Sequence, residues 1–409
     1  MGQAKLHALG RNLKFFVTPE TTLGSYVALA APASSTTEGM RVLSSSFEYA
    51  QERVDRADAR GDTRSLENRI TRRVECTYSV ESYLLPSGTA GTAPDIDLLL
   101  KAVMGTGAIG GSQEVGSITA TGCKYTLSAT QAMDSFCLTR ETSGVVQQRM
   151  RGCYGGEFTI TGSGADEPKI TFSGTGIDMW NVGRAVTTNS GSSATQYVEV
   201  GSGSAAVNMS KMFSTASSSY PVQVKLGSTD NVEIVDVSST NVDITLGSAQ
   251  SWSIGDVIQP YSPALSDSGV PINGVSGSVT VADTVSAMPI TAFDITVSNN
   301  TKAINDEAFT NLMTDFIPGF RSVTGNITVR ANQDQIAELN RRRDFGTRNV
   351  EMILGDTSSP GNYVVVSMPK CEFGFGALEI PEAEEATFTL PFTALASGTG
   401  ENEIVLGFF

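Results

Sequence analysis

Two stretches of this chain, residues 47–105 and 293–346, resemble one another, and this repeat limits the folds open to the chain. Each begins with a short alternating run, passes through a polar segment of about twenty residues, and resumes with a second alternating run. The second runs extend from Arg72 to Val80 and from Arg321 to Val329, with Arg, Val and Val at matching places. Both stretches then enter a helical pattern that ends at glycine. A duplicated β-rich unit predicts two similar domains side by side, an arrangement suited to symmetric assemblies.

The composition indicates a globular, β-rich protein. The chain has 409 residues, enough for two or three domains, and is 40% hydrophobic with 41 glycines. Its five cysteines are odd in number and lack Cys-x-x-Cys spacing, which favours buried thiols in a reducing compartment over disulfides or metal ligands. No apolar run has the length of a membrane span, and the first residues lack a secretory apolar segment. We therefore expect a soluble protein that stays in the compartment where it is made.

The net charge of −15 disfavours functions that grip nucleic acid through its phosphates, because these need clustered Lys and Arg. Acidity is compatible with a different contact with DNA. A passage through which DNA must slide without adhering would also avoid a basic lining.

Composition and turn residues divide the chain into four segments. Residues 1–40 form an arm with little periodicity, which we expect to lie extended. Residues 41–180 and 286–409 carry short alternating runs set off by Gly, Ser and Pro, and each predicts an antiparallel β-domain. Between them, residues 181–285 are rich in Ser, Gly, Thr and Val and predict a small inserted β-domain. The predicted fold is mainly β: two tandem sandwich or partial-barrel units, each with one flanking helix, plus the insertion.

Each repeat contains one segment with clear helix signals. In the first, Pro94 suits the first turn, Asp97 complements the positive end of the helix dipole, and Gly105 can supply the left-handed stop. In the second, Asn332 can cap the helix and Gly346 can end it. We expect each helix to pack on the flank of its sheet.

Three segments resemble the tail tube proteins of long, non-contractile phage tails, the major tail proteins of the siphophage type. Residues 80–96 are similar to the segment before the helix in that family. Residues 318–325 are similar to a strand-initiating motif in its later half. A third similarity to the family lies in residues 42–47 followed by residues 52–58. Together these segments cover both repeat units, whereas the insertion at 181–285 has no counterpart.

The resemblance implies a structural protein that forms stacked rings, with sheets of neighbouring subunits joined into a barrel around a channel for DNA. Such rings are normally six-fold, so a subunit with two tube domains would form a pseudo-hexameric trimer. Barrel closure would also pair the open sheet edges that otherwise invite aggregation. The implied partners are further copies of the chain, tape-measure, tail-tip and tail-terminator proteins, and DNA passing transiently and non-specifically through the channel. The implied location is the virion tail, assembled in the cytoplasm of the bacterial host.

Alternation assigns faces to the predicted barrel strands. Val74, Cys76, Tyr78 and Val80 should point into the core, which leaves the polar positions between them on the opposite face. We predict that these positions and their counterparts in the second unit face the channel; an ordinary solvated face is the alternative. The predicted channel-facing residues are Glu75, Thr77, Ser79, Glu81, Asp294, Thr296, Asn326 and Thr328.

The two polar excursions are candidates for contacts between stacked rings. Residues 53–73 alternate in charge and correspond in place to a stacking loop of the family; a solvated loop is the alternative. Their counterpart, residues 299–316, carries apolar side chains that water does not favour, which predicts docking more strongly. The predicted stacking residues are Arg53, Asp55, Arg56, Asp58, Arg60, Arg64, Phe309, Leu312, Met313 and Phe316.

The sequence gives little support to catalysis, and it predicts no enzyme, cofactor or metal site. The single histidine, His7, lies in the N-terminal arm, where a catalytic triad would depend on an irregular segment. Paired carboxylates for glycoside hydrolysis stay open, because their separation is a matter of three-dimensional structure. The densest acidic cluster is Glu382, Glu384 and Glu385.

Two other function classes stay open at this point. A β-sandwich adhesin would account for the Ser, Thr and Gly content. A carbohydrate-binding or carbohydrate-active protein would need exposed aromatic side chains, for which the chain offers only two tryptophans, Trp180 and Trp252. Both alternatives predict a monomer, whereas a tube subunit should polymerise.

Overall fold

The computed structural model confirms a mainly β fold. It describes residues 12–25, 29, 39–54, 70–128, 134–164, 166–191, 197–199, 213, 221–237, 243–265, 269–274, 276–281, 290–304, 312–331, 346–374, 376–380, 385–398 and 401–409. A bilayer-spanning helix is absent from this described part of the chain, in which α1 (Asp97–Met104) has eight residues.

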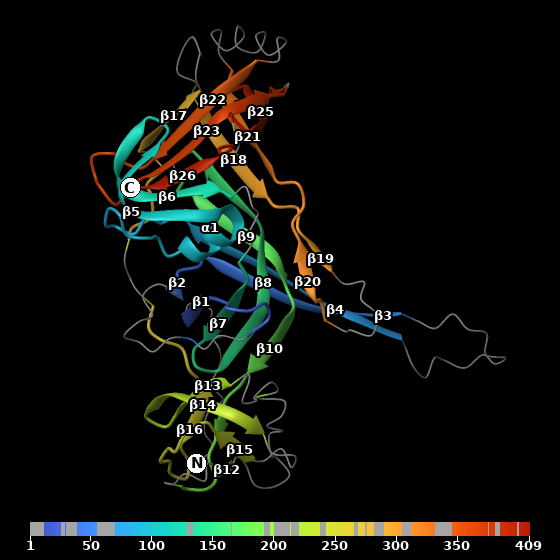
Figure 1. The fold of residues 1–409 in the computed structure, drawn as a ribbon. Helices are drawn as coiled ribbons and strands as arrows, with labels where there is room; N and C mark the ends of the chain where they lie inside the picture. The colour runs from blue at the N-terminus through green and yellow to red at the C-terminus, as the bar shows by residue number, and fades with distance from the viewer. Residues whose placement is uncertain are drawn as a thin grey trace, which may run out of the picture.

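One antiparallel sheet runs across both repeat units (Figure 1). Its strands, in spatial order, are β3 (Ser44–Val54), β4 (Ile70–Tyr83), β9 (Lys169–Gly176), β8 (Val146–Ser163), β18 (Ile290–Ser298), β21 (Ser322–Arg330), β25 (Thr387–Ala394) and β24 (Ala377–Glu379). The hairpin of β3 and β4 projects well beyond the body of the molecule (Figure 1).

The duplication is visible in the order of these strands. In the first unit the strands lie in the spatial order first, second, fourth, third along the chain: β3, β4, β9, β8. The second unit repeats this order with β18, β21, β25 and β24. The two units join where β8 pairs with β18, from Glu157 opposite Ser298 to Ser163 opposite Ala292.

A second sheet packs over the first and encloses the main core. Its strands, in order, are β5 (Gly105–Val115), β6 (Ile118–Leu127), β26 (Val405–Phe408), β23 (Val364–Phe373), β22 (Thr347–Leu354) and β17 (Gly277–Val281). Because β26 lies between β6 and β23, the C-terminal strand ties the first unit to the second. One continuous apolar core therefore serves both units.

The helix α1 ends as its residues predict but begins later, at Asp97, so that Pro94 lies before the first turn and not in it. Asp97 lies in its first turn, where its carboxylate accepts hydrogen bonds from Lys101 Nζ (2.8 Å) and the Tyr125 hydroxyl (2.6 Å). Gly105 ends the helix with a φ of 89°, a conformation that residues with a Cβ rarely adopt. Leu99, Leu100, Ala102 and Val103 are buried in the core. The second predicted helix, at 332–346, lies almost entirely outside the described residues.

Two described segments of the predicted N-terminal arm pair with other strands of the fold and do not form a separate arm. Residues Leu13–Pro19 form strand β1, which pairs with β7 (Phe136–Thr142) and with the short β2 (Gly39–Met40). Phe15 and Phe16 are both fully buried. Strand β7 pairs with the first half of β8, and β10 (Asp178–Val182) pairs with the same half on its other side. Strands β1 and β2 are therefore integral parts of the sheet that β7, β8 and β10 form.

A six-stranded antiparallel sheet with its own apolar core lies within the segment predicted as an insertion, at the opposite end of the molecule from β22 and β25 (Figure 1). Its strands, in order, are β11 (Ala185–Val186), β16 (Val257–Pro260), β13 (Val222–Leu226), β14 (Thr229–Val237), β15 (Asp243–Leu246) and β12 (Tyr197–Glu199).

Buried polar side chains attach this small sheet to the body of the molecule. The Gln147 side chain on β8 donates to the Tyr261 carbonyl (2.8 Å) and accepts a hydrogen bond from Arg149 Nε (2.6 Å). Arg149 Nη2 donates to the Gln223 carbonyl on β13 (3.3 Å), and the Gln223 side chain bonds both the amide and the carbonyl of Leu29. Because buried polar groups are costly unless they are bonded, this network orients the small sheet against β8.

Candidate assembly surfaces

The predicted channel-facing residues lie together on one face of the large sheet. Burial alternates along β4, with Val74, Cys76, Tyr78 and Val80 at most 3% exposed and the four polar positions turned to the other side. In β18 and β21 the same alternation separates buried apolar side chains from Asp294, Thr296, Asn326 and Thr328. The strand pairing therefore brings all eight residues, from two distant parts of the sequence, onto one surface.

Polar side chains form continuous rows across this face. One row passes from strand to strand through Glu81, Thr171, Thr159, Thr296, Thr324 and Thr393. Within the rows, Thr159 Oγ1 and Thr296 Oγ1 are hydrogen-bonded at 2.9 Å, and Asn326 Nδ2 donates to both carboxylate oxygens of Asp294 at 3.1 Å. Cross-strand pairs of this kind stabilise a sheet. That the face lines a channel stays a prediction.

The large sheet ends on each side in a strand with one unpaired edge among the described residues, β3 and β24, although the end of β23 also pairs with β25 beside β24 and so joins the two sheets. Within the described residues, β3 pairs only with β4, and β24 pairs only with β25. Leu43, directly before β3, is 40% exposed, and Leu378, in the middle of β24, is 48% exposed although it pairs with the core residue Phe388. Unpaired edges with exposed apolar side chains are sites at which another strand can add.

The two predicted stacking segments differ in outcome. Arg53 is exposed near the end of β3, whereas Asp55, Arg56, Asp58, Arg60, Arg64 and Phe309 lie outside the described residues. Met313 and Phe316 are 4% and 6% exposed, so their burial needs no docking partner, and their contact with a neighbouring ring stays a prediction. The Phe316 ring lies 3.9 Å from the Tyr154 ring, and Met313, partly buried Leu312 and Ile177 complete the cluster. Their apolar character is satisfied within the chain.

All five thiols are buried, and none of them forms a disulfide. Burial raises the pKa of Cys76 and of Cys371 to about 12. No group of three or more His, Cys, Asp or Glu side chains in the described ranges is arranged to hold a metal ion. His7, Glu382 and Glu384 lie outside the described residues.

The two tryptophans do not form a sugar-stacking platform, because Trp180 and Trp252 are each 6% exposed. Trp252 packs within the core of the small sheet, where its indole nitrogen donates to Asn189 at 3.0 Å. Glu385, just before β25, is exposed and pairs with Arg330 at 2.9 Å.

No protein-family model and no curated protein sequence matches this chain. The functional conclusion therefore depends on the sheet, its edges and its polar face.

The short strand β24 was not predicted from the sequence. Only Leu378 separates Ala377 from Glu379 in this strand, and three residues are too few for alternation to be recognised. The duplication was the sequence signal that could have indicated β24. In the first unit β8 lies beside β9, and β24 occupies the equivalent position beside β25 in the second unit.

Proposed function

We propose that this chain is the subunit of a tail tube, in which three copies close into a ring and rings stack around a channel. The observation that carries the proposal is the junction of β8 with β18. There the last strand of one four-stranded unit pairs with the first strand of an equivalent unit. The corresponding strands at the outer edges, β24 and β3, have no such partner among the described residues.

If the same junction formed between chains, the unpaired edges of β3 and β24 would each gain a hydrogen-bonded partner strand. If β24 of one copy pairs with β3 of the next, every unit meets its neighbour as the two units within a chain already meet. Such a head-to-tail contact closes into a ring when the rotation per copy divides a full turn. It would also cover Leu43 and Leu378, which are half-exposed on the core side of the two edge strands.

The estimated diameter of such a ring is large enough for a channel that admits DNA. Each chain supplies the eight strands from β3 to β24 to this face, so three chains would supply a barrel of about twenty-four. With strands about 4.8 Å apart and tilted by about 40°, such a barrel is roughly 50 Å across between opposite backbones. Side chains on the inner face would narrow this opening and still leave room for a nucleic-acid duplex.

The chemistry of the polar face suits passage without adhesion. Its rows consist mainly of Thr and Ser hydroxyls, with Glu75, Glu81, Glu157 and Asp294 as acidic members and Lys169 pairing with Glu81 at 3.7 Å. Such a surface offers water-like hydrogen bonds and a net negative charge, so phosphates sliding past would find no basic cluster to hold them.

Sedimentation velocity over a range of concentrations tests this assignment. We expect the 43.1 kDa chain to give a species of three chains, followed by larger polymers. A monomer that persists at millimolar concentration, also after addition of tail-tip and tape-measure proteins, would overturn the proposal and favour an adhesin or carbohydrate-binding protein.

A further inference from the structure

One aromatic side chain stands almost entirely in solvent. Phe320 is 95% exposed, in the loop between β20 (Asp315–Ile317) and β21, and Ile317 at the end of β20 is 56% exposed. β20 pairs with β19 (Lys302–Ile304), which follows β18 in the chain. A fully exposed phenylalanine leaves a large apolar area in water, and exposed aromatic residues of this kind are enriched where proteins bind one another.

The Phe320 loop is fixed by hydrogen bonds. Asn300, at a φ of 48°, donates from Nδ2 to the Phe320 carbonyl at 2.6 Å, and the Gly319 amide donates to the Asn299 carbonyl at 3.0 Å. Asn299 is 5% exposed, and its Nδ2 donates to the carbonyls of Val103 (2.8 Å) and Gly155 (3.2 Å). The exposed ring is therefore held on a preorganised support, which lowers the entropy cost of binding.

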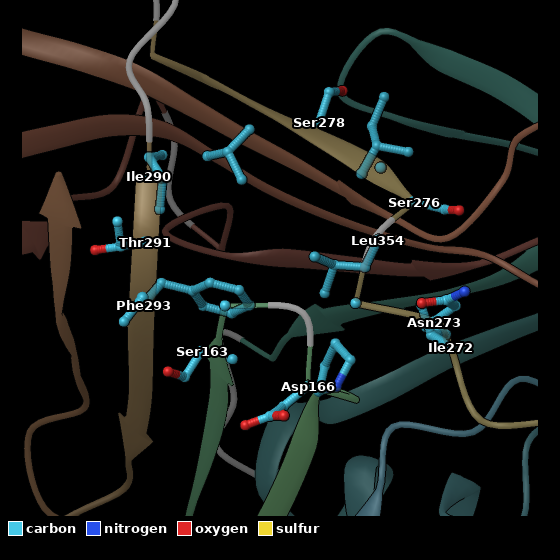
Figure 2. Close-up of a pocket in the computed structure, with 18 residues that line it drawn as sticks. Ser163, Asp166, Ile272, Asn273, Ser276, Ser278, Ile290, Thr291, Phe293 and Leu354 are labelled. Atoms are coloured by element: carbon cyan, nitrogen blue, oxygen red, sulfur yellow. The ribbon is translucent and has the colours of Figure 1, made fainter. Parts of the chain in front are cut away.

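A cavity of about 240 Å³ opens at the other end of β18 (Figure 2). Its apolar lining comes from Phe293, Ile290, Ile272 and Leu354, and its polar groups include Asp166 and Ser278. The cavity lies where the two packed sheets part, between the start of β18, the turn after β8, and β17. The lining is mixed, with slightly more polar than apolar surface, and its apolar walls offer contacts to an inserted aromatic side chain.

The exposed ring and the cavity lie at opposite ends of the same strand. Phe320 is adjacent to the C-terminal end of β18, where Ser298 pairs with Ser322, whereas Ile290 to Phe293 line the cavity at the N-terminal end. The five to eight residues of β18 between the cavity lining and Ser298 place them about 20 Å apart along the strand. The ring therefore cannot reach the cavity of its own chain.

We propose that Phe320 of one copy inserts into this cavity of a second copy in the adjacent ring and holds the two rings together. The proposal rests on the proposed tube function, and it assigns the contact between rings, which is separate from the edge pairing within a ring. An anchor at one end of a subunit and its receptor at the other make a head-to-tail contact that does not close, and such contacts build filaments. A second copy fits as the occupant because the chain itself carries both complementary parts.

Site-directed cross-linking tests the pairing directly. All five native cysteines are buried, so new surface thiols will be the main targets of a short bismaleimide linker. Ser278 is exposed at the cavity, and a mixture of F320C and S278C chains should yield a covalent dimer in concentrated protein. The control replaces F320C by I254C, because Ile254 is 70% exposed but lies beside the small sheet. Equal cross-linking in both mixtures would overturn the proposal.

Truncation of the ring separates this inference from the proposed function. F320A should still form three-chain rings, while the concentration needed for tubes should rise at least tenfold relative to I254A. V279F, which fills the cavity from β17, should give the same loss of stacking with rings intact. Normal tubes from F320A would overturn the anchor and leave the tube function standing. Absence of rings in the unmodified protein would overturn both.

Discussion

Thr159 and Thr296, 137 residues apart in the sequence, share a hydrogen bond of 2.9 Å between their hydroxyl groups. They lie directly opposite one another where β8 of the first unit pairs with β18 of the second. This pair marks the junction that turns two repeated units into one sheet, and the same junction serves as the model for contacts between chains.

The coupling between these two hydroxyls can be measured. We expect T159V and T296V each to lower the free energy of unfolding by about 1 kcal/mol, because each leaves one hydroxyl without its partner. The double variant should lose less than the two single losses combined, since neither hydroxyl is then left unmatched. Urea denaturation at low protein concentration provides the four free energies. Strict additivity would show that the hydroxyls do not interact across the junction.

Charges at the sheet edges should prevent ring formation. L43K and L378K place a lysine at the two half-exposed edge positions, where a neighbouring strand would have to bury it. Each variant should keep the circular dichroism spectrum and melting temperature of the unmodified monomer and lose the three-chain species in sedimentation. I254K is the matched control and should still assemble. Rings of normal size from L43K or L378K would show that the edges do not meet.

Removal of the Asn299 side chain should destabilise the chain itself. N299A leaves the carbonyls of Val103 and Gly155 without their amide donor in a buried setting. The expected loss is about 1–3 kcal/mol in the free energy of unfolding, the usual cost of unsatisfied buried polar groups. S298A, one residue earlier on the polar face, should cost less than about 0.5 kcal/mol. Equal losses for the two variants would argue against the role assigned to Asn299.

The buried thiols predict a loss of stability at alkaline pH. Burial raises the pKa of Cys76 and Cys371 to about 12 in the folded chain, whereas an unfolded thiol ionises near 9. Above pH 9 the unfolded state loses protons that the folded state keeps, so stability contributed by the neutral thiols should fall as pH rises from 9 towards 12. Comparison of the unfolding free energies of C76A and the parent between pH 8 and 10.5 tests this. The unfolding free energy should fall less steeply with pH for C76A than for the parent. Identical pH dependences would contradict the raised pKa assigned to Cys76.

Positive charge on the polar face should make assembled tubes retain DNA. T296K and T328K add lysines to the face that we propose lines the channel, where phosphates would pass. We expect tubes of the double variant to hold duplex DNA at about 50 mM salt and to release it at about 200 mM, since binding to phosphates weakens steeply as the salt concentration rises. A lysine pair on the exposed surface of the small sheet, at Asp230 and Asp236, is the control. Equal retention by both would place the polar face outside the channel.

The sequence predicted those parts of the fold that depend on local pattern. Alternation in β4, β18 and β21 assigned the buried and polar faces, and Gly105 marked the end of α1 because its conformation needs a residue without a side chain. Strand β1 was missed because Phe15, Phe16 and Val17 are consecutive apolar residues without alternation. Both of its faces are covered, and that burial comes from distant parts of the chain.

Tertiary contacts also determine which apolar side chains near Phe316 are buried and which are exposed. In sequence, Met313 and Phe316 belong to the apolar group predicted to dock, and Phe320 follows a few residues later. The structure gives Met313 and Phe316 a partner in Tyr154, which lies more than 150 residues away in the chain, and leaves Phe320 exposed. Sequence pattern alone does not separate these two outcomes, because both depend on where β8 passes.

Negative-stain electron microscopy of the concentrated protein tests the central claim most directly. Class averages viewed along the axis should show hollow rings with three-fold symmetry and six similar lobes, one for each four-stranded unit. L378K examined in parallel should show single subunits. Compact monomers in the unmodified protein, also in the presence of tail-tip proteins, would contradict the account.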